Sequence, residues 1–285
     1  MKLAYLIQCH KNPEQIEMLI ESLDLDIDDN VIIHVDAKCN DTQEKIKILS
    51  MGYKNVHVVP HSVTVNWSGK SQIYATLKMI DYLYSNNMAY DYCLLISGED
   101  VVLNPNKLKD FLGISSNKSF IEFRSDHAKY YWRINRYNIF RDCHLSQSWM
   151  TRAISSVFVR SQRVLNIKRN NFRDEDIYLG SQWVTISRQH MDILLDFIDD
   201  KYLKKFNYTS CSDEHFFQML FKQCINADEY ETYNFRHIKF AEGANSPSYL
   251  SISELMSVRD YPNIFIARKV TSTTLSEYLL LSILD

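Results

Sequence analysis

The first hundred residues alternate short apolar runs with amphipathic segments, and this alternation restricts the chain to few folds. The segments between the runs repeat apolar side chains at three- and four-residue spacing, the pattern of a helix with one buried face. A strand, helix, strand order predicts right-handed parallel crossovers. We therefore expect an open α/β sheet whose ligands bind beyond the carboxyl ends of the strands. The apolar runs are residues 3–7, 31–35, 56–59 and 92–96.

Acidic residues follow two of these expected strands, at the edge where ligands bind. Asp36 follows the second strand, and Asp100 lies shortly after the fourth. Either acid could instead cap the helix that comes next. Residues 67–71 end like a phosphate-binding loop, but the earlier glycine and the strand leading into it are missing. Asp26 and Asp28 have the Asp-x-Asp spacing of a divalent-cation site, but we interpret their acidic surroundings as a solvated loop.

Residues 210–217 place two carboxylates at the start of a further expected helix. Ser212 is a natural N-cap, and the apolar residues that follow repeat at helical spacing. A carboxylate there is held by the backbone while its head points out of the helix end, which suits a general base. Glu214 is our candidate base, and Asp213 is expected to cap the helix or to steady the local loop. The alternative is that both acids only complement the helix dipole.

Composition places the chain among ordinary globular proteins. Its 285 residues are 46% hydrophobic and 24% charged, which fits one large domain or two intimate ones. The net charge is -3 without a long basic run, so binding to nucleic acid has no support. Six scattered cysteines without a close pair indicate reduced thiols. We expect a cytoplasmic protein, because neither a signal peptide nor a run of about 18 apolar residues is present.

The middle of the chain is expected to cover and complete a site. Residues 118–173 are rich in Arg, Tyr, Asn and Trp with weak periodicity, and we interpret them as insertions over a cleft. Residues 178–187 predict a strand and residues 190–198 a helix. The side chains expected inside that helix are Ile193, Leu194 and Phe197.

The C-terminal part carries a basic pair and an apolar tail. Residues 264–267 are apolar and lead directly to Arg268 and Lys269, which bind an anion or are merely solvated. Residues 275–284 have helical length and unusual apolarity. This tail could dock on the core, pair with a second subunit or rest on a membrane surface. Docking is favoured, because the tail has few charges to bury and lacks the basic face of a membrane-bound helix.

Short segments spread over almost the whole chain match one family in order and spacing. They are Ala4-Tyr5-Leu6-Ile7 with His10, Ile33-His34-Val35-Asp36, Trp67-Ser68, Leu95-Ile96-Ser97-Gly98-Glu99-Asp100, Gly180-Ser181-Gln182-Trp183-Val184-Thr185-Ile186-Ser187-Arg188, Ser212-Asp213-Glu214 and Phe265-Ile266-Ala267-Arg268-Lys269. Each segment is weak alone, but their joint order is specific. The chain resembles the core-2/I-branching enzymes, glycosyltransferase family 14, which include β-1,6-N-acetylglucosaminyltransferases and peptide O-xylosyltransferases.

The resemblance implies an α/β, GT-A-type glycosyltransferase fold with a Rossmann-like half and a mixed central sheet. A single catalytic domain is expected, with residues 1–115 as the nucleotide-binding half and residues 116–285 as the acceptor and catalytic half. The family uses UDP-sugars and inverts the anomeric centre without a metal, so UDP-GlcNAc is the expected donor and no cofactor is expected. The expected acceptor is a glycan, free or lipid-linked, in surface-polysaccharide assembly. The missing membrane anchor of the animal enzymes suits a bacterial cytosolic relative, with peripheral membrane contact left open.

Matched residue by residue, the resemblance also assigns roles to individual side chains. Glu214 matches the catalytic base, and Asp36 matches the strand-end acid near the nucleotide. Lys269 matches a basic residue on the UDP diphosphate, and Arg268 beside it is a second candidate for meeting the negative charge of the leaving group. The remaining candidates are Asp100 near the nucleotide, and Glu122, Arg133 or Arg136, Asp213 and Trp183 on the substrate side. Trp183 is alternatively a packing residue.

Two other classes of function stay open from the residues alone. A non-catalytic protein that binds a nucleotide sugar or a glycan could use the same fold. A glycoside hydrolase is the third hypothesis, since paired carboxylates also serve hydrolysis. Stabilisation by UDP in the presence of EDTA separates the first two hypotheses from the hydrolase, and acceptor-dependent release of UDP separates a transferase from a binder.

Overall fold

The structure, a computed structural model, describes residues 1–244 and 246–284, with the side chains of residues 283 and 284 left aside. The chain divides into two compact units. The first unit comprises Met1–Ser62, Met79–Asn117 and Asn234–Asp285, and the second comprises Val63–Lys78 and Lys118–Tyr233. The C-terminal segment thus returns to the unit that the N-terminus begins. That both units make up one catalytic domain stays a prediction.

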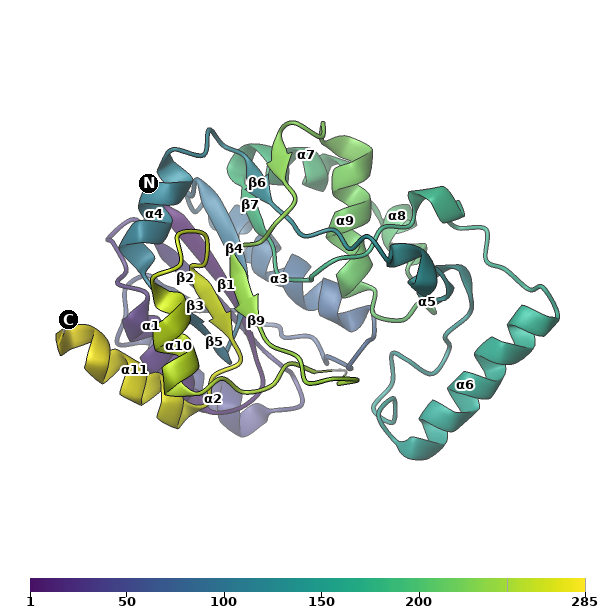
Figure 1. Cartoon of the computed structure of the whole chain (residues 1–285), viewed down its shortest axis with the longest axis horizontal. Coiled ribbons are helices and arrows are strands. Elements are labelled where there is room, and N and C mark those ends of the chain that lie inside the picture. The colour runs from purple at the N-terminus through teal and green to yellow at the C-terminus, as the bar shows by residue number, and fades with distance from the viewer. Residues whose placement is uncertain (245, 285) are drawn as a thin grey trace. The chain divides into compact units, whose positions relative to one another are not determined.

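A parallel sheet forms the centre of the first unit. Its strands are β1 (Leu3–Cys9), β2 (Asn30–Val35), β3 (Val56–Val58) and β4 (Tyr92–Ser97), in the order β3-β2-β1-β4 (Figure 1). β1 and β4 are apolar and buried along nearly their whole length, as strands covered on both faces must be. Helices α1 (Pro13–Ser22) and α2 (Asn40–Ser50) contact each other, as successive right-handed crossovers in one direction require. The predicted Rossmann-like arrangement is present.

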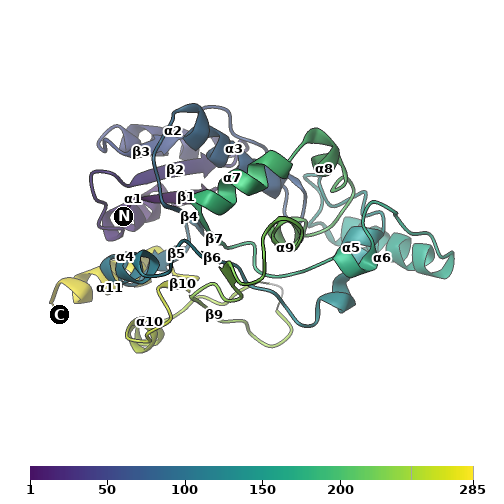
Figure 2. The ribbon, with the colours of Figure 1, turned by 90° about the horizontal axis from the view of Figure 1, so that it is seen from above.

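A smaller sheet completes the first unit. β10 (Ile266–Arg268) lies between β5 (Asp100–Val102), to which it is antiparallel, and β9 (Arg236–Ile238), to which it is parallel. Figure 2 shows β5, β10 and β9 in this order. The register sets Arg268 opposite Asp100, which matters for the site. Helices α4 (Pro105–Gly113), α10 (Ile252–Arg259) and α11 (Ser272–Leu284) belong to the same unit.

The apolar tail docks on the core of the first unit. In α11, Leu275 and Tyr278 are buried, and the Tyr278 hydroxyl donates a hydrogen bond of 2.6 Å to the Leu103 carbonyl. The helix also contacts α1. The prediction of docking is therefore confirmed for these side chains, although Leu280 and Leu281 remain exposed. Over the described part of the chain, every helix is too short or too polar to cross a membrane.

The second unit contains three paired strands and several helices. β6 (Ser119–Phe120) lies between β7 (Thr185–Ser187), antiparallel to it, and β8 (Tyr230–Glu231), parallel to it. α3 (Ser71–Ser85) begins in this unit and ends in the first. The other helices are η1 (His127–Tyr130), α5 (Trp132–Asn135), α6 (Trp149–Val164), η2 (Asp174–Asp176), α7 (Arg188–Phe197), α8 (Asp200–Lys204) and α9 (Asp213–Cys224).

Aromatic packing fixes α9 in the second unit. The ring of Phe216 lies 5.4 Å from that of Phe206 and 6.1 Å from that of Tyr202, and Phe221 lies 5.5 Å from Tyr230. Edge-on contacts of this kind stabilise beyond the area they bury. The apolar face of α9 predicted from its spacing is thus the part that anchors the helix.

Two sequence predictions in the second unit were wrong. The strand predicted over residues 178–187 is reduced to β7, because Gly180 packs against the Glu122 carbonyl so closely that a Cβ would lie 1.8 Å from its oxygen. At Gly180 the chain therefore packs against the Glu122 backbone instead of pairing with a neighbouring strand. In α7, Ile193 and Phe197 are exposed rather than inside, because the buried face is formed by His190, Met191 and Leu194.

Candidate active site

The turn between β4 and β5 holds a buried carboxylate at the carboxyl end of the parallel sheet. Asp100 is fully buried and accepts hydrogen bonds from the Ser97 backbone N–H (3.0 Å) and hydroxyl (2.9 Å). The turn requires Gly98, since a Cβ there would lie 2.4 Å from the Ile16 Cδ1. Arg268 Nη1, brought opposite by the strand register, lies 2.5 Å from Asp100 Oδ1. Backbone geometry therefore positions this pair.

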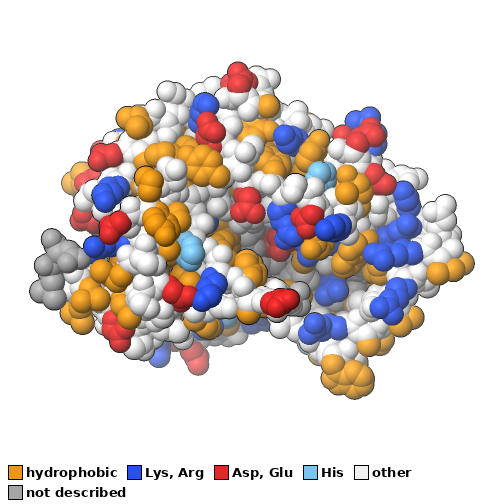
Figure 3. Space-filling model, in the orientation of Figure 1, with side chains coloured by type: hydrophobic (Ala, Val, Ile, Leu, Met, Phe, Trp, Pro, Cys, Tyr) orange, Lys and Arg blue, Asp and Glu red, His pale blue; other side chains and the backbone are white. Residues whose placement is uncertain are grey.

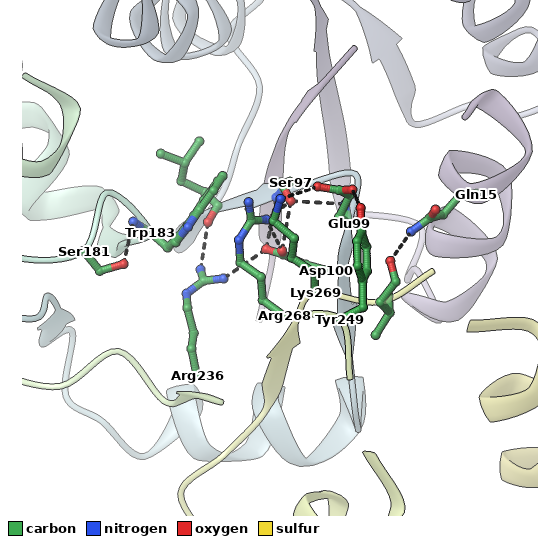
Figure 4. A network of polar contacts seen from close by, with 12 residues as sticks. Gln15, Ser97, Glu99, Asp100, Ser181, Trp183, Arg236, Tyr249, Arg268 and Lys269 are labelled. Atoms are coloured by element: carbon green, nitrogen blue, oxygen red, sulfur yellow. Dashed lines mark hydrogen bonds and ion pairs between the residues drawn. The ribbon is translucent and has the colours of Figure 1, made fainter. Parts of the chain in front are cut away.

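A second arginine shares the same carboxylate. The side chain of Arg236 is fully buried, with Nη2 donating to the Leu95 carbonyl at 2.8 Å and Nη1 lying 3.5 Å from Asp100 Oδ2. Figure 4 shows Arg236 and Arg268 converging on Asp100 from separate strands. Sequence analysis missed Arg236, because a lone arginine in a short strand has no distinctive spacing. Asp100 thus serves to hold two guanidinium groups.

Glu99, the neighbour of Asp100, gathers two lysines. Lys11 Nζ and Lys269 Nζ each lie 3.0 Å from its carboxylate, and the Tyr249 hydroxyl donates to Oε1 at 2.6 Å. Burial alone would raise the pKa of Glu99, but the hydrogen bonds from Tyr249 and the two lysines outweigh it and lower the pKa to about 2. Glu99 is therefore held ionised.

These residues form what we call the basic cluster: Lys11, Glu99, Asp100, Arg236, Arg268 and Lys269. Figure 4 labels all of them except Lys11. Four cationic side chains surround two carboxylates, which leaves a surplus of two positive charges. Lys11 is 42% exposed and Lys269 is 17% exposed, so the surplus lies on side chains that solvent reaches. A basic surplus at the carboxyl ends of parallel strands suits an anionic ligand.

Asp36 lies at the end of β2 in the same unit and is nearly buried. Its Oδ1 accepts a hydrogen bond of 3.0 Å from the Lys38 backbone N–H, and its Oδ2 lies 3.5 Å from Lys38 Nζ. Burial and the charges of Lys11 and Lys269 lower the pKa of His10, whereas the charge of Asp36 acts in the opposite direction. Asp36 therefore shares the electrostatic surroundings of the basic cluster.

The second unit holds Glu214 at the start of α9. Its Oε2 lies 2.5 Å from Arg133 Nη1, and its carbonyl accepts a hydrogen bond of 2.9 Å from the Gly180 N–H. The guanidinium of Arg133 lies 4.6 Å above the ring of Tyr130, a cation–π contact that helps to fix it. The side chain of Glu214 is 36% exposed. Glu214 is thus fixed at its backbone and at one carboxylate oxygen, while its side chain stays partly exposed to solvent.

Asp213, next to Glu214, has a different environment. Its Oδ1 is buried and has no hydrogen-bond partner within the described residues. Burial, together with the charge of Glu214, raises the pKa of Asp213 well above its ordinary range. The predicted side-chain cap by Ser212 was wrong, because its hydroxyl lies 2.5 Å from that of Thr209 instead of capping α9. The helix start therefore carries one carboxylate that is 36% exposed and one with a buried oxygen that lacks a partner among the described residues.

Across residues 1–244 and 246–284, no group of three or more His, Cys, Asp or Glu side chains is arranged to hold a metal ion.

Comparison with known proteins decides the family. The sequence model described as Core-2/I-Branching enzyme matches residues 3–264. The chain belongs to the Core-2/I-Branching enzyme family. Together with the strand order of the first unit, this confirms the predicted α/β, GT-A-type fold.

Curated relatives of this family member are large animal proteins. Human (Homo sapiens) xylosyltransferase 2 is 23% identical over 213 residues, which are 72% of this chain and 22% of that protein. Chimpanzee (Pan troglodytes) xylosyltransferase 1 is 21% identical over 245 residues, 83% of this chain and 24% of that protein. The chain therefore spans less than a quarter of the length of the curated relatives it matches.

Solved structures with a similar course of the chain include two glycosyltransferases. The apo structure of the bifunctional glycosyltransferase WbbM has a TM-score of 0.44 and 12% identity, covering 97% of this chain and 49% of that one. The galactosyltransferase LgtC with donor and acceptor sugar analogs has a TM-score of 0.40 and 10% identity, covering 98% of this chain and 95% of that one.

The substrate-side residues expected for a Core-2/I-Branching enzyme lie in different surroundings. Arg133 contacts Glu214, whereas Arg136 is buried and its Nη1 lies 3.4 Å from the Gln162 carbonyl in α6. The Glu122 carbonyl accepts a hydrogen bond of 3.2 Å from Gln218, and Trp183 is buried. The family resemblance left Arg133 and Arg136 as alternatives, and Arg133 is the one that contacts the candidate base.

Proposed function

We propose that this Core-2/I-Branching enzyme is an inverting glycosyltransferase that moves GlcNAc from UDP-GlcNAc to a hydroxyl of an acceptor glycan. The observation that carries the proposal is the Glu214–Arg133 pair at the start of α9. The carboxylate is held by a guanidinium and the backbone carbonyl of Glu214 by the Gly180 N–H, yet the side chain is 36% exposed. A fixed and accessible carboxylate suits a general base.

In the proposed reaction, Glu214 accepts the proton of the acceptor hydroxyl as its oxygen attacks C1 of the donor sugar. The new C–O bond forms on the face opposite UDP, so the anomeric centre inverts. The bond from C1 to the diphosphate oxygen breaks, and its electron pair leaves with UDP. Arg133 keeps Glu214 in place and has no direct role in the proton transfer. Base catalysis of this kind contributes roughly a hundred- to ten-thousandfold in rate.

The basic cluster supplies what the leaving group needs. We propose that Lys11 and Lys269 contact the diphosphate. Arg268, which is held by Asp100, contributes its positive charge without contacting the diphosphate directly. Asp36 lies at the neighbouring strand end, where the nucleoside is expected. Fixed cations that meet developing negative charge stabilise the transition state without reorganisation. On this proposal the reaction requires no divalent metal.

The sugar and the acceptor are the finer parts of the proposal. GlcNAc follows from the family resemblance, and the names of the curated relatives favour xylose as the second candidate. For the acceptor we propose a glycan of surface-polysaccharide assembly, carried on a lipid at the cytoplasmic face of a membrane. UDP-sugar and glycan are then the partners of the enzyme.

Release of UDP tests the proposal. The full chain is incubated with UDP-GlcNAc or UDP-xylose and a panel of glycan acceptors, with and without EDTA. We expect release that depends on the acceptor, continues in EDTA and is lost in Glu214→Gln. Release without acceptor would favour a hydrolase, and thermal stabilisation by UDP without any release would favour a binding protein.

A further inference from the structure

Helix α6 of the second unit exposes five large apolar side chains, while two of the three side chains that it buries are polar. On the protein side, Ser155 and Gln162 are buried together with Val159. On the solvent side, Val157 is 65% exposed and Ile154 is 55% exposed. An ordinary surface helix has the opposite arrangement. The further exposed apolar side chains of α6 are Trp149, Met150 and Val164.

The exposed apolar side chains share one face. At 100° per residue, the arc from Trp149 through Val157 to Ile154 covers about 140° of the helix. The exposed apolar surface continues past the helix end at Leu165. We call this surface the α6 apolar face. A contiguous exposed patch of this kind marks an interaction site more often than a scattered apolar side chain does.

Hydrogen bonds hold α6 in this orientation. Gln162 Oε1 accepts a hydrogen bond of 2.8 Å from the Tyr137 N–H, and Gln162 Nε2 donates one of 2.9 Å to the Tyr137 carbonyl. The Gln162 carbonyl is also approached by Arg136 at 3.4 Å. Turning the helix to bury its apolar face would break these buried contacts, each of which is costly to lose without replacement. The outward apolar face is therefore built into the unit.

The charges on α6 itself are all positive. The helix contains Arg152, Arg160 and Arg163, all exposed, and no acidic residue. Within the described part of the chain, none of these three guanidinium groups has a carboxylate partner. At 100° per residue they span about 80°, with Arg152 and Arg163 outside one edge of the apolar face and Arg160 just inside it. Figure 3 shows blue basic side chains along α6 with orange apolar side chains at its outer edge.

We propose that α6 docks the protein on a membrane surface rich in anionic phospholipid, with the apolar face in the interface and the arginines on the lipid phosphates. A basic amphipathic helix with Trp on its apolar side is the chemistry that such surfaces bind. The helix is about 24 Å long, so it lies on the bilayer rather than across it. The tail helix α11 is less suitable, because it has no Lys or Arg. The proposal is independent of the proposed reaction, since lipid binding requires no sugar donor.

Co-sedimentation with vesicles tests the docking. The full chain is mixed with vesicles of phosphatidylcholine alone or of phosphatidylcholine with phosphatidylglycerol, at low and high salt. We expect binding to the anionic vesicles that weakens as salt rises. Ile154→Asp/Val157→Asp should reduce that binding at least about tenfold. The control is Met51→Asp/Ile114→Asp, two apolar residues of the first unit that are even more exposed, at 83% and 82%, and this variant should bind like the wild type.

Charge variants test the three arginines of α6. Each of Arg152→Gln, Arg160→Gln and Arg163→Gln should weaken binding to the anionic vesicles roughly fivefold. The control replaces exposed lysines of the first unit, Lys45, Lys47 and Lys54, by Gln and should change binding little. Circular dichroism checks that every variant is folded.

Three results would overturn the docking proposal. The wild type could fail to prefer anionic vesicles, or Ile154→Asp/Val157→Asp could bind as well as the wild type. Alternatively, sedimentation equilibrium could show a dimer that this variant dissociates while vesicle binding is absent, which would make α6 a contact between two copies of the chain.

Discussion

Two glutamates, one in each unit, are both paired with cations but differ in how far they are enclosed. Glu99 is bound by a tyrosine and two lysines, and its side chain is 12% exposed. Glu214 is paired with Arg133 and is 36% exposed. A carboxylate surrounded by donors is occupied in holding its partners in position. One with an open oxygen can accept a proton from a ligand, so the comparison separates an anchor from a candidate base.

The aspartates beside these glutamates differ in the same way. Asp100 is fully buried, but Ser97, Arg236 and Arg268 satisfy its carboxylate. One carboxylate oxygen of Asp213 is buried without a hydrogen-bond partner among the described residues, and the pKa of Asp213 is raised. Burial therefore stabilises the charged form of one aspartate through its partners and disfavours that of the other. The four carboxylates give four ways to test the comparison.

The largest effect is expected for the anchored aspartate. Asp100→Asn leaves the buried Arg236 and Arg268 without a counter-charge, and breaking a buried ion pair on one side costs about 3–5 kcal/mol. Urea unfolding measures the loss of stability. The exposed Asp110→Asn on α4 is the control and should stay within about 0.5 kcal/mol of the wild type. An Asp100→Asn protein as stable as the wild type would mean that the arginines do not depend on this carboxylate.

The open glutamate should affect turnover instead of stability. Glu214→Gln keeps size and hydrogen bonding but cannot accept a full proton, so kcat should fall at least about a hundredfold. Binding of UDP should stay near normal, which places the loss in the chemical step. Glu175→Gln, at an exposed position of the same unit, is the matched control and should leave kcat unchanged. Near wild-type turnover of Glu214→Gln would remove the proposed base.

The lysines held by Glu99 are expected to have a smaller effect, on binding. Lys269→Ala and Lys11→Ala should each raise the Kd for UDP roughly tenfold, because each removes a charge-assisted contact to the diphosphate. Calorimetry in EDTA measures the change, and Lys107→Ala on α4 is the control. If the double variant bound UDP as tightly as the wild type, the basic cluster would be a structural feature only.

Local sequence patterns were sufficient for the first sheet and for the position of Glu214. Continuous apolar strands and the stripe of α9 are signals within a few residues, and both predictions agree with the structure. The basic cluster was predicted only in part, since Lys11 and Arg236 come from distant segments and join it only through folding. The strand predicted over residues 178–187 is present only as β7, and the close backbone approach at Gly180 has no signal in the sequence.

Helix α6 was not predicted, because residues 118–173 show only weak periodicity. Periodicity would also not say which side of the helix the protein covers. The contacts of Gln162 with Tyr137 help to fix that choice. Polar side chains that anchor a helix thus decide what its apolar side is free to do.

The smallest effect concerns Asp213, and it is expected in the pH dependence of stability. Its pKa is raised on folding, so between the ordinary range of an aspartate and neutral pH the folded protein binds more protons at this site than the unfolded chain. Stability must then fall as pH rises through that interval. Asp213→Asn removes the titration, so the variant should gain on the wild type from acid to neutral pH. Glu99, whose pKa is lowered to about 2, acts in the opposite direction, since its contribution is lost only as pH falls through that value. Urea unfolding of both proteins across this range measures the difference, and parallel curves would show that Asp213 is as well solvated as an ordinary surface aspartate.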